Sequence, residues 1–215
     1  MKKVFYLMLC MIVGLCATSC LSDDGNDNNN YAPLTQEQKA AQIKEMAGIY
    51  GGWIYYINDT TNAIDSTAIS WELTARDSMM TIVNFPVKVL ANGISKTSDA
   101  HKILMDGSSV QVSSILHPYA NTIDQSGYYT FWFFPRDFKI EFTTEHEGKD
   151  YDVTVEFTDE MSAYTTDWSS SSRFYAYGQY YEKKLLAYLL IKSVKVGENN
   201  YITSRAMEIF GSKGY

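Results

Sequence analysis

Cysteine is scarce and confined to the start of the chain. The three cysteines are Cys10, Cys16 and Cys20, and the sequence beyond them has none. This excludes disulfide bonds and thiolate metal sites from the rest of the chain. Stability must therefore come from an apolar core, and about 180 residues are enough for one core. We expect a single β-rich domain over residues 34–215.

Basic residues are also few. The chain has 18 Lys and Arg against 25 Asp and Glu, a net charge of −7. Without Lys2 and Lys3, which belong to the leader described below, the imbalance is 16 against 25, or −9. Binding of nucleic acid needs clustered basic side chains, so this composition argues against it. It also argues against docking on anionic lipid through a polybasic patch.

Motifs that carry catalysis or cofactor binding are missing. The sequence contains no His-x-Glu-x-x-His, Gly-x-Ser-x-Gly, P-loop or Gly-x-Gly-x-x-Gly. The histidines His101, His117 and His146 lack the spacing of metal ligands, and we interpret His146 as part of a solvated turn.

The carboxylates offer no better catalytic pattern. Three glutamates alternate with apolar residues in expected strands, which predicts that they face solvent. They are Glu72, Glu141 and Glu156. The aspartates near residue 24 miss the spacing of a calcium loop. We therefore expect no enzyme, no metal and no cofactor. A hydrolase whose site the spacing does not reveal remains the least favoured alternative.

The first twenty residues have the organisation of a bacterial export signal. Lys2-Lys3 is followed by an uncharged, mostly apolar stretch over 4–17, which is too short for a bilayer-spanning helix of ~20 residues. Ala17-Thr18-Ser19-Cys20 resembles the lipobox of bacterial lipoproteins, although Leu is more usual where Ala17 stands. The resemblance implies a signal peptide over 1–19 and attachment of lipid, including palmitate, to Cys20. The alternative is an ordinary cleaved signal.

An acidic segment follows Cys20. Leu21-Ser22-Asp23-Asp24 resembles the signal that sends some lipoproteins to the outer face of the outer membrane, which implicates Ser22, Asp23 and Asp24 in export. Residues 20–33 are rich in Asn and Asp, which predicts a flexible tether. We expect a lipid-anchored, surface-exposed protein, with attachment facing the periplasm as the alternative.

One helix precedes the strands. Thr35 and Gln38 fit a capping box, and Gly48 marks the end of the helix. The short length of its apolar stripe predicts a lid or plug on the body of the domain. The stripe comprises Ala40, Ile43, Met46 and Ala47.

Strands are predicted over most of the remaining chain because apolar and polar residues alternate. The segments AISWELTA, MMTIVNF, HKILM and SVQVSSIL all have this character. YYTFWFF, over 128–134, is apolar on both faces, which predicts that both are covered. Pro86–Gly93 is predicted as a short helical turn.

The sharpest local prediction is a hairpin over 138–157, with a turn at Glu147-Gly148. Its register pairs Phe142 with Val153, Ile140 with Val155 and Phe138 with Phe157. The same register places Lys139 opposite Glu156, which predicts a cross-strand charge pair.

Roughly eight to ten strands after one short helix predict a mainly β protein, an antiparallel barrel or sandwich. MAGIYGGWIYY resembles the start of lipocalin-like (calycin-like) barrels, where the aromatic residue of Gly-x-Trp or Gly-x-Tyr packs across the closed end. The whole chain, most clearly SWELTARDSMMTIVNFPVKVLA, resembles a family of outer-membrane lipoproteins of unknown function from gut anaerobes. This resemblance implies no activity.

One aromatic segment is a candidate binding site. WSSSSRFYAYGQYYEKK contains Trp168, Arg173, Tyr175, Tyr177 and Tyr181, whose tyrosines share one face if the chain is extended. Exposed aromatic side chains with a polar group suit contact with a glycan or a protein. The alternative is an ordinary strand at the edge of the core.

Three short motifs resemble the O-glycosylation signal of certain gut bacteria. They mark Thr60, Ser66 and Ser78, and the first two are predicted to lie in a turn.

Together these features predict a lipid-anchored surface protein of binding type. Its ligand would be a glycan, a small apolar molecule in a barrel mouth or a protein partner. The alternative is a structural or accessory subunit of an outer-membrane complex that has no ligand pocket.

Overall fold

The computed structural model describes residues 34–58, 61, 63–119, 127–164 and 171–214, with the backbone alone over 161–164 and 171–174. The described residues belong to one compact unit. The signal peptide, Cys20 and the acidic segment predicted within residues 1–33 lie outside the described residues and stay predictions.

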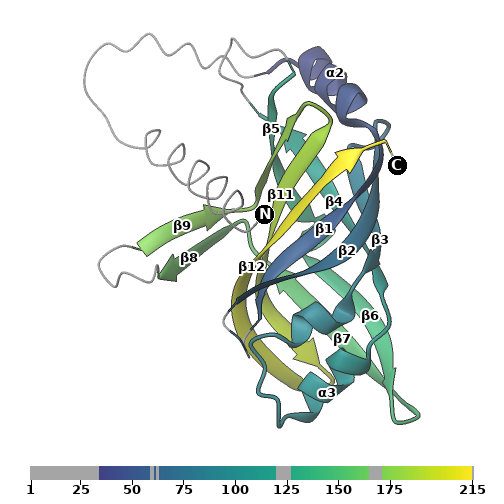
Figure 1. Cartoon of the computed structure of the whole chain (residues 1–215), viewed down its shortest axis with the longest axis vertical. Helices are drawn as coiled ribbons and strands as arrows, with labels where there is room; N and C mark the ends of the chain where they lie inside the picture. The colour runs from purple at the N-terminus through teal and green to yellow at the C-terminus, as the bar shows by residue number, and fades with distance from the viewer. Residues whose placement is uncertain (1–33, 59–60, 62, 120–126, 165–170, 215) are drawn as a thin grey trace. The chain divides into compact units, whose positions relative to one another are not determined.

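Eight antiparallel strands form a closed barrel (Figure 1). They are β1 (Gly48–Asn58), β2 (Ala63–Thr74), β3 (Met79–Phe85), β4 (Val110–Pro118), β5 (Tyr129–Pro135), β10 (Tyr177–Tyr181), β11 (Lys184–Val196) and β12 (Asn199–Lys213). The neighbours follow the order β10-β5-β4-β3-β2-β1-β12-β11, and pairing of β10 with β11 closes the ring. The prediction of a mainly β, antiparallel fold is confirmed, and the barrel is the correct choice over the sandwich.

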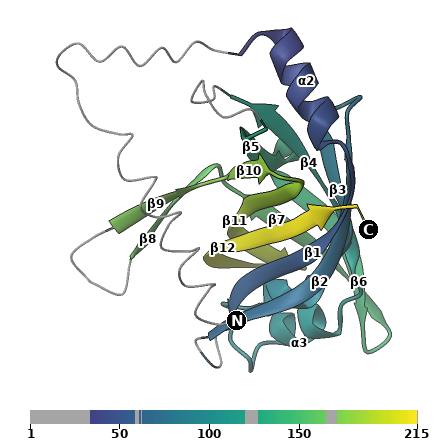
Figure 2. The same cartoon turned by 45° about the horizontal axis from the view of Figure 1, so that its top comes forward.

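Strand β11 takes part in two pairings along its length. Its residues 184–187 pair with β10, and residues 191–196 pair with β7 (Lys149–Phe157), with a bulge between Ile191 and Ser193. Strand β7 in turn pairs with β6 (Lys139–His146), so a hairpin extends the sheet beyond the barrel. A separate pair, β8 (Glu160–Tyr164) and β9 (Ser171–Tyr175), projects from the barrel in both views (Figures 1 and 2).

The hairpin β6–β7 has the predicted register between Phe142 and Val153 and between Ile140 and Val155. The predicted pair of Phe138 with Phe157 is wrong. Phe138 ends the 3₁₀ turn η2 (Arg136–Phe138) with a positive φ of 52°, so the chain enters the strand only at the next residue.

Lys139 lies opposite Glu156 as predicted, but each side chain forms its ion pair with another residue. Lys139 lies 3.1 Å from Glu141 on its own strand. Glu156 lies 3.5 Å from Lys192 and accepts a hydrogen bond from Ser193 at 3.0 Å, both on β11. Strand β11 packs along β7 and supplies closer partners than β6 does.

Helix α2 (Gln36–Met46) lies over one end of the barrel (Figure 1). Its capping box is confirmed, because Thr35 accepts from the Gln38 amide at 3.2 Å and Gln38 accepts from the Thr35 amide at 2.8 Å. The predicted apolar stripe is partly wrong. Ala40 is exposed, and Gln42 is buried beside Ile43 and Met46.

A second helix, α3 (Asp99–Asp106), replaces the strand predicted for HKILM. Ser98 caps it by accepting from the His101 amide at 3.2 Å. Ala100, Ile103 and Leu104 are buried together because they recur at helical spacing. The turn predicted after Pro86 is the buried 3₁₀ helix η1 (Val87–Ala91), and α3 and η1 lie together at the opposite end from α2 (Figure 1).

The end covered by α2 is built around two stacked rings. Tyr50 and Trp71 have centroids 5.3 Å apart at 8°, and the Tyr50 hydroxyl donates to the Met46 carbonyl. The aromatic residue that packs across this end is thus Tyr50 of the Gly-x-Tyr sequence Gly48-Ile49-Tyr50, at the start of β1. Trp53 of the neighbouring Gly-x-Trp points outward and is 47% exposed.

Bulky side chains fill the barrel interior. The core cluster contains residues from all eight barrel strands, from β7 and from the three short helices that cover the ends. Its largest fully buried members include Trp71, Tyr50, Phe85, Phe131, Phe133 and Met80.

Candidate functional site

The candidate tyrosines lie where β9 passes into the barrel. Tyr175 ends β9, and Tyr177 and Tyr181 lie on β10 with their side chains on the outer face. Tyr175 and Tyr177 are half-buried, and Tyr181 is exposed. Arg173 pairs through its backbone on β9, where side chains are not described, and Trp168 lies outside the described residues.

The barrel register extends this group into a row across five further strands. Tyr177 lies opposite Trp132 on β5, and Trp132 lies opposite His117 on β4. On the other side, Tyr188 on β11 lies opposite Glu208 on β12, which lies opposite Tyr55 on β1. Each residue is flanked by interior positions and therefore points outward. We call these six residues the outer aromatic row: Tyr55, Glu208, Tyr188, Tyr177, Trp132 and His117.

Ring contacts connect the row and broaden it. Tyr177 and Tyr188 have centroids 5.4 Å apart. Trp132 stacks on Tyr119 at 5.1 Å and meets Tyr175 edge-on at 6.2 Å. Trp132 nevertheless remains 36% exposed, so the prediction that both faces of YYTFWFF are covered is wrong for its outer face.

His117 begins a second set of stacked rings on the same outer surface. It stacks on Phe134 at 5.1 Å, and Phe134 stacks on Phe138 at 4.7 Å. Burial lowers the pKa of His117, and the charge of Lys39 lowers it further, so the neutral imidazole is favoured. This side of the row is therefore aromatic, with a neutral ring favoured at His117.

Glu208 is the one carboxyl of the row. The Tyr188 hydroxyl donates to its Oε2 at 3.2 Å. Burial raises the pKa of Glu208 despite that hydrogen bond, which acts in the opposite direction. The pKa of Tyr55 is raised by burial and by the charge of Glu208. A partly desolvated carboxyl thus lies among aromatic side chains on an outer surface.

A concave site lies at the other end of the barrel. An open cavity of about 440 Å³ is lined by residues of α3, the β6–β7 turn and the β11–β12 turn. Its lining includes Asp99, Ala100, Lys102, Ile103, His146, Glu147, Tyr151, Val196, Glu198 and Tyr201.

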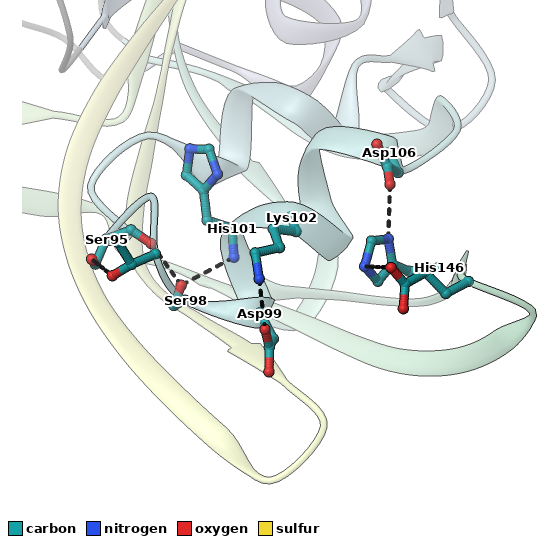
Figure 3. Close-up of polar contacts among 9 residues, drawn as sticks. Ser95, Ser98, Asp99, His101, Lys102, Asp106 and His146 are labelled. Atoms are coloured by element: carbon teal, nitrogen blue, oxygen red, sulfur yellow. Dashed lines mark hydrogen bonds and ion pairs between the residues drawn. The ribbon is translucent and has the colours of Figure 1, made fainter.

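His146 joins two of these elements (Figure 3). Its Nδ1 lies 2.8 Å from Oδ2 of Asp106, at the end of α3, and its side chain is only 12% exposed. The prediction that His146 belongs to a solvated turn is therefore wrong. The sequence gives no sign of this contact, because the partners are 40 residues apart.

A second cavity, of about 400 Å³, lies at the barrel mouth beside α2. Glu45 of α2 accepts a hydrogen bond from the Tyr129 hydroxyl, and its carbonyl accepts from Lys213 Nζ at 2.8 Å. Tyr181 and Glu182 also line this cavity. These contacts hold the helix across the mouth, and the lining also includes the charged residues Lys183 and Lys213.

The O-glycosylation candidates occupy different surroundings. Thr60 lies outside the described residues. Ser66 lies within β2, so the prediction that it occupies a turn is wrong. Ser78 is in the β2–β3 turn with a φ of 55°. Modification of all three stays a prediction.

Comparison with known proteins gives one match. The sequence model of DUF4840, a domain of unknown function, matches residues 45–196. The chain belongs to the DUF4840 family. Within this DUF4840 chain the matched stretch contains five members of the outer aromatic row, and Glu208 follows it. No curated protein and no solved structure matches.

Among the described residues, no three His, Cys, Asp or Glu side chains come together as metal ligands would. Within the same ranges, no helix has the length and apolar character needed to cross a bilayer.

Proposed function

We propose that this protein is a lipid-anchored surface protein that binds a partner through the outer aromatic row and has no enzymatic activity. The observation that carries the proposal is the continuous outward row of aromatic side chains around Glu208. Trp and Tyr are the residues that most often dominate binding energy at protein interfaces. An aromatic surface of this kind on the outside of a barrel is typical of an interaction site.

The filled interior supports binding on the outside. Phe131, Phe133 and Trp71 occupy the space that a small apolar ligand would need. Such a ligand would have to displace close-packed side chains.

The ring geometry supports a protein partner over a glycan. Trp132 has one ring face against Tyr119 and His117 has one against Phe134, which leaves a sugar at most one face of each ring. Aromatic side chains that carry a polar group also suit packing and hydrogen bonding by a protein. This also accommodates a role as an accessory subunit of a larger complex at the outer membrane.

The cellular address rests on the sequence. The segment ending in Cys20 supports lipid attachment, and Ser22, Asp23 and Asp24 support exposure on the outer face. Attachment facing the periplasm is the alternative. Either location supplies partner proteins at a membrane.

Site-specific photo-crosslinking tests the proposal. In one strain a benzophenone amino acid replaces Tyr177. In a control strain it replaces Ile202, which lies on β12 outside the row and is 80% exposed. We expect one discrete protein adduct from position 177 only, and its loss when Trp132→Ala is added. Equal adducts from both positions, or none, contradict a protein partner. Retention on polysaccharide gels that depends on Trp132 would support a glycan instead.

A further inference from the structure

The cavity beside α3 has the dimensions of a small-molecule site. Its volume of about 440 Å³ lies within the range of roughly 300–1,000 Å³ typical of ligand pockets. Ala100, Ile103 and Val196 are buried core residues at its wall, and Tyr151 and Tyr201 add two half-buried aromatic side chains. The two tyrosines suit a ligand with an aromatic body.

His146 is one of the residues that line this cavity, and Figure 3 shows its contact with Asp106. Its Nδ1 is 2.8 Å from the Asp106 carboxylate. Nε2 lies 4.0 Å from Oε1 of Glu147, another lining residue. The imidazole and the Glu147 carboxylate therefore lie side by side at the wall of the cavity.

The charges around the cavity favour a cation. Lys102 lies 3.1 Å from the Asp99 carboxylate, so this pair is already matched. The other charged lining residues are Glu147 and Glu198, both acidic. The amino end of α3 does not reverse this preference, because Ser98 caps it and Asp99 balances its dipole.

We propose that this cavity binds a small organic amine with an aromatic or apolar body. The ammonium group donates to the Glu147 and Glu198 carboxylates. The body lies against Tyr151 and Tyr201, whose ring faces also attract a cation. This site is separate from the outer aromatic row, and the proposal does not depend on the function of that row.

Three probes of similar shape test the charge requirement: benzylamine, benzyl alcohol and benzoate. Each probe is titrated into the purified full chain, and calorimetry measures its affinity. We expect benzylamine to bind at least about tenfold more tightly than either other probe, since only its ammonium group forms charge-assisted hydrogen bonds with the two carboxylates. Equal affinities for the three probes, or no measurable binding of benzylamine, overturn the proposal.

Matched variants test the location. Glu198→Gln should weaken benzylamine binding about tenfold, as a lost charge-assisted hydrogen bond does. Glu141→Gln removes the same charge from an exposed carboxylate on β6 and should leave the affinity unchanged. Glu198 and Glu141 are both exposed, so both variants should fold like the wild type. An equal loss in both variants would show general attraction to an acidic protein and would overturn the site.

Discussion

Tyr188 on β11 donates its hydroxyl hydrogen to Oε2 of Glu208 on β12 across 3.2 Å. The carboxyl that accepts it is flanked along β12 by the buried residues Met207 and Ile209, yet it points outward. One hydrogen bond does not compensate for the loss of water, because burial still raises the pKa of Glu208. The folded protein therefore carries a carboxylate that costs stability.

Glu208→Gln should stabilise the protein at neutral pH and remove part of its pH dependence. The folded-state pKa of Glu208 lies above the unfolded value, so its contribution to stability is fully present below the unfolded pKa and is lost as pH rises through the folded pKa. We expect the variant to melt a few degrees higher at pH 7 and to gain less stability on acidification. Thermal unfolding followed by circular dichroism measures both effects.

Glu72→Gln is the matched control, because Glu72 is an exposed carboxylate on β2. Its melting temperature should stay close to that of the wild type. A Glu208→Gln protein that melts lower than wild type at pH 7 would contradict the account of Glu208 as a desolvated charge.

Gly211→Ala should destabilise the barrel. A Cβ at Gly211 would lie 2.4 Å from the Gly51 carbonyl oxygen and 2.5 Å from Cη2 of Trp71. Such overpacking costs about 1–3 kcal/mol, which urea denaturation measures. Ser212→Ala, at the next position of β12, should cost less than about 0.5 kcal/mol. A combination with Trp71→Phe should be less than additive, and full additivity would contradict the contact.

Asn and Gly in place of Glu182 and Lys183 should stabilise the β10–β11 hairpin. These two turn residues have φ values of 49° and 65°, which Asn-Gly adopts at lower cost. Left-handed backbone costs other residues about 1–2 kcal/mol, so we expect a gain of that order in urea denaturation. Gly148→Ala, with a φ of 73° and open space around the new methyl group, should lose stability. An unchanged urea denaturation midpoint in the Asn-Gly variant would contradict backbone strain at Glu182 and Lys183.

Local patterns in the sequence predicted the local structures well. The register of Phe142 with Val153 followed from alternation and from a glycine turn, and both signals lie within twenty residues. The capping box of Thr35 and Gln38 depends on four residues and is also present. Helix α3 was missed although the sequence carried its signal, since Ser98 precedes Ala100, Ile103 and Leu104 at helical spacing.

The candidate sites depend on contacts that no local pattern contains. Tyr177 was predictable as an outward residue, but its neighbour Tyr188 follows from closure of the barrel by β10 and β11. Glu208 becomes unusual only because β1 and β11 place tyrosines on both sides of it. The contact of His146 with Asp106 likewise forms only when α3 packs against the β6–β7 hairpin. No pattern within one segment can show this, because the two residues are 40 positions apart.

Cys20→Ala should abolish lipid attachment. The apolar segment before Cys20 is too short to span a bilayer of ~20 helical residues, so the thiol is the expected anchor. Two acyl chains hold a protein at a membrane stably, whereas an unlipidated chain has no such anchor. Cells fed an alkyne fatty acid should label the wild-type protein and leave the variant unlabelled, while Cys10→Ala, inside the leader, keeps its label. Label retained by Cys20→Ala would rule out this attachment site.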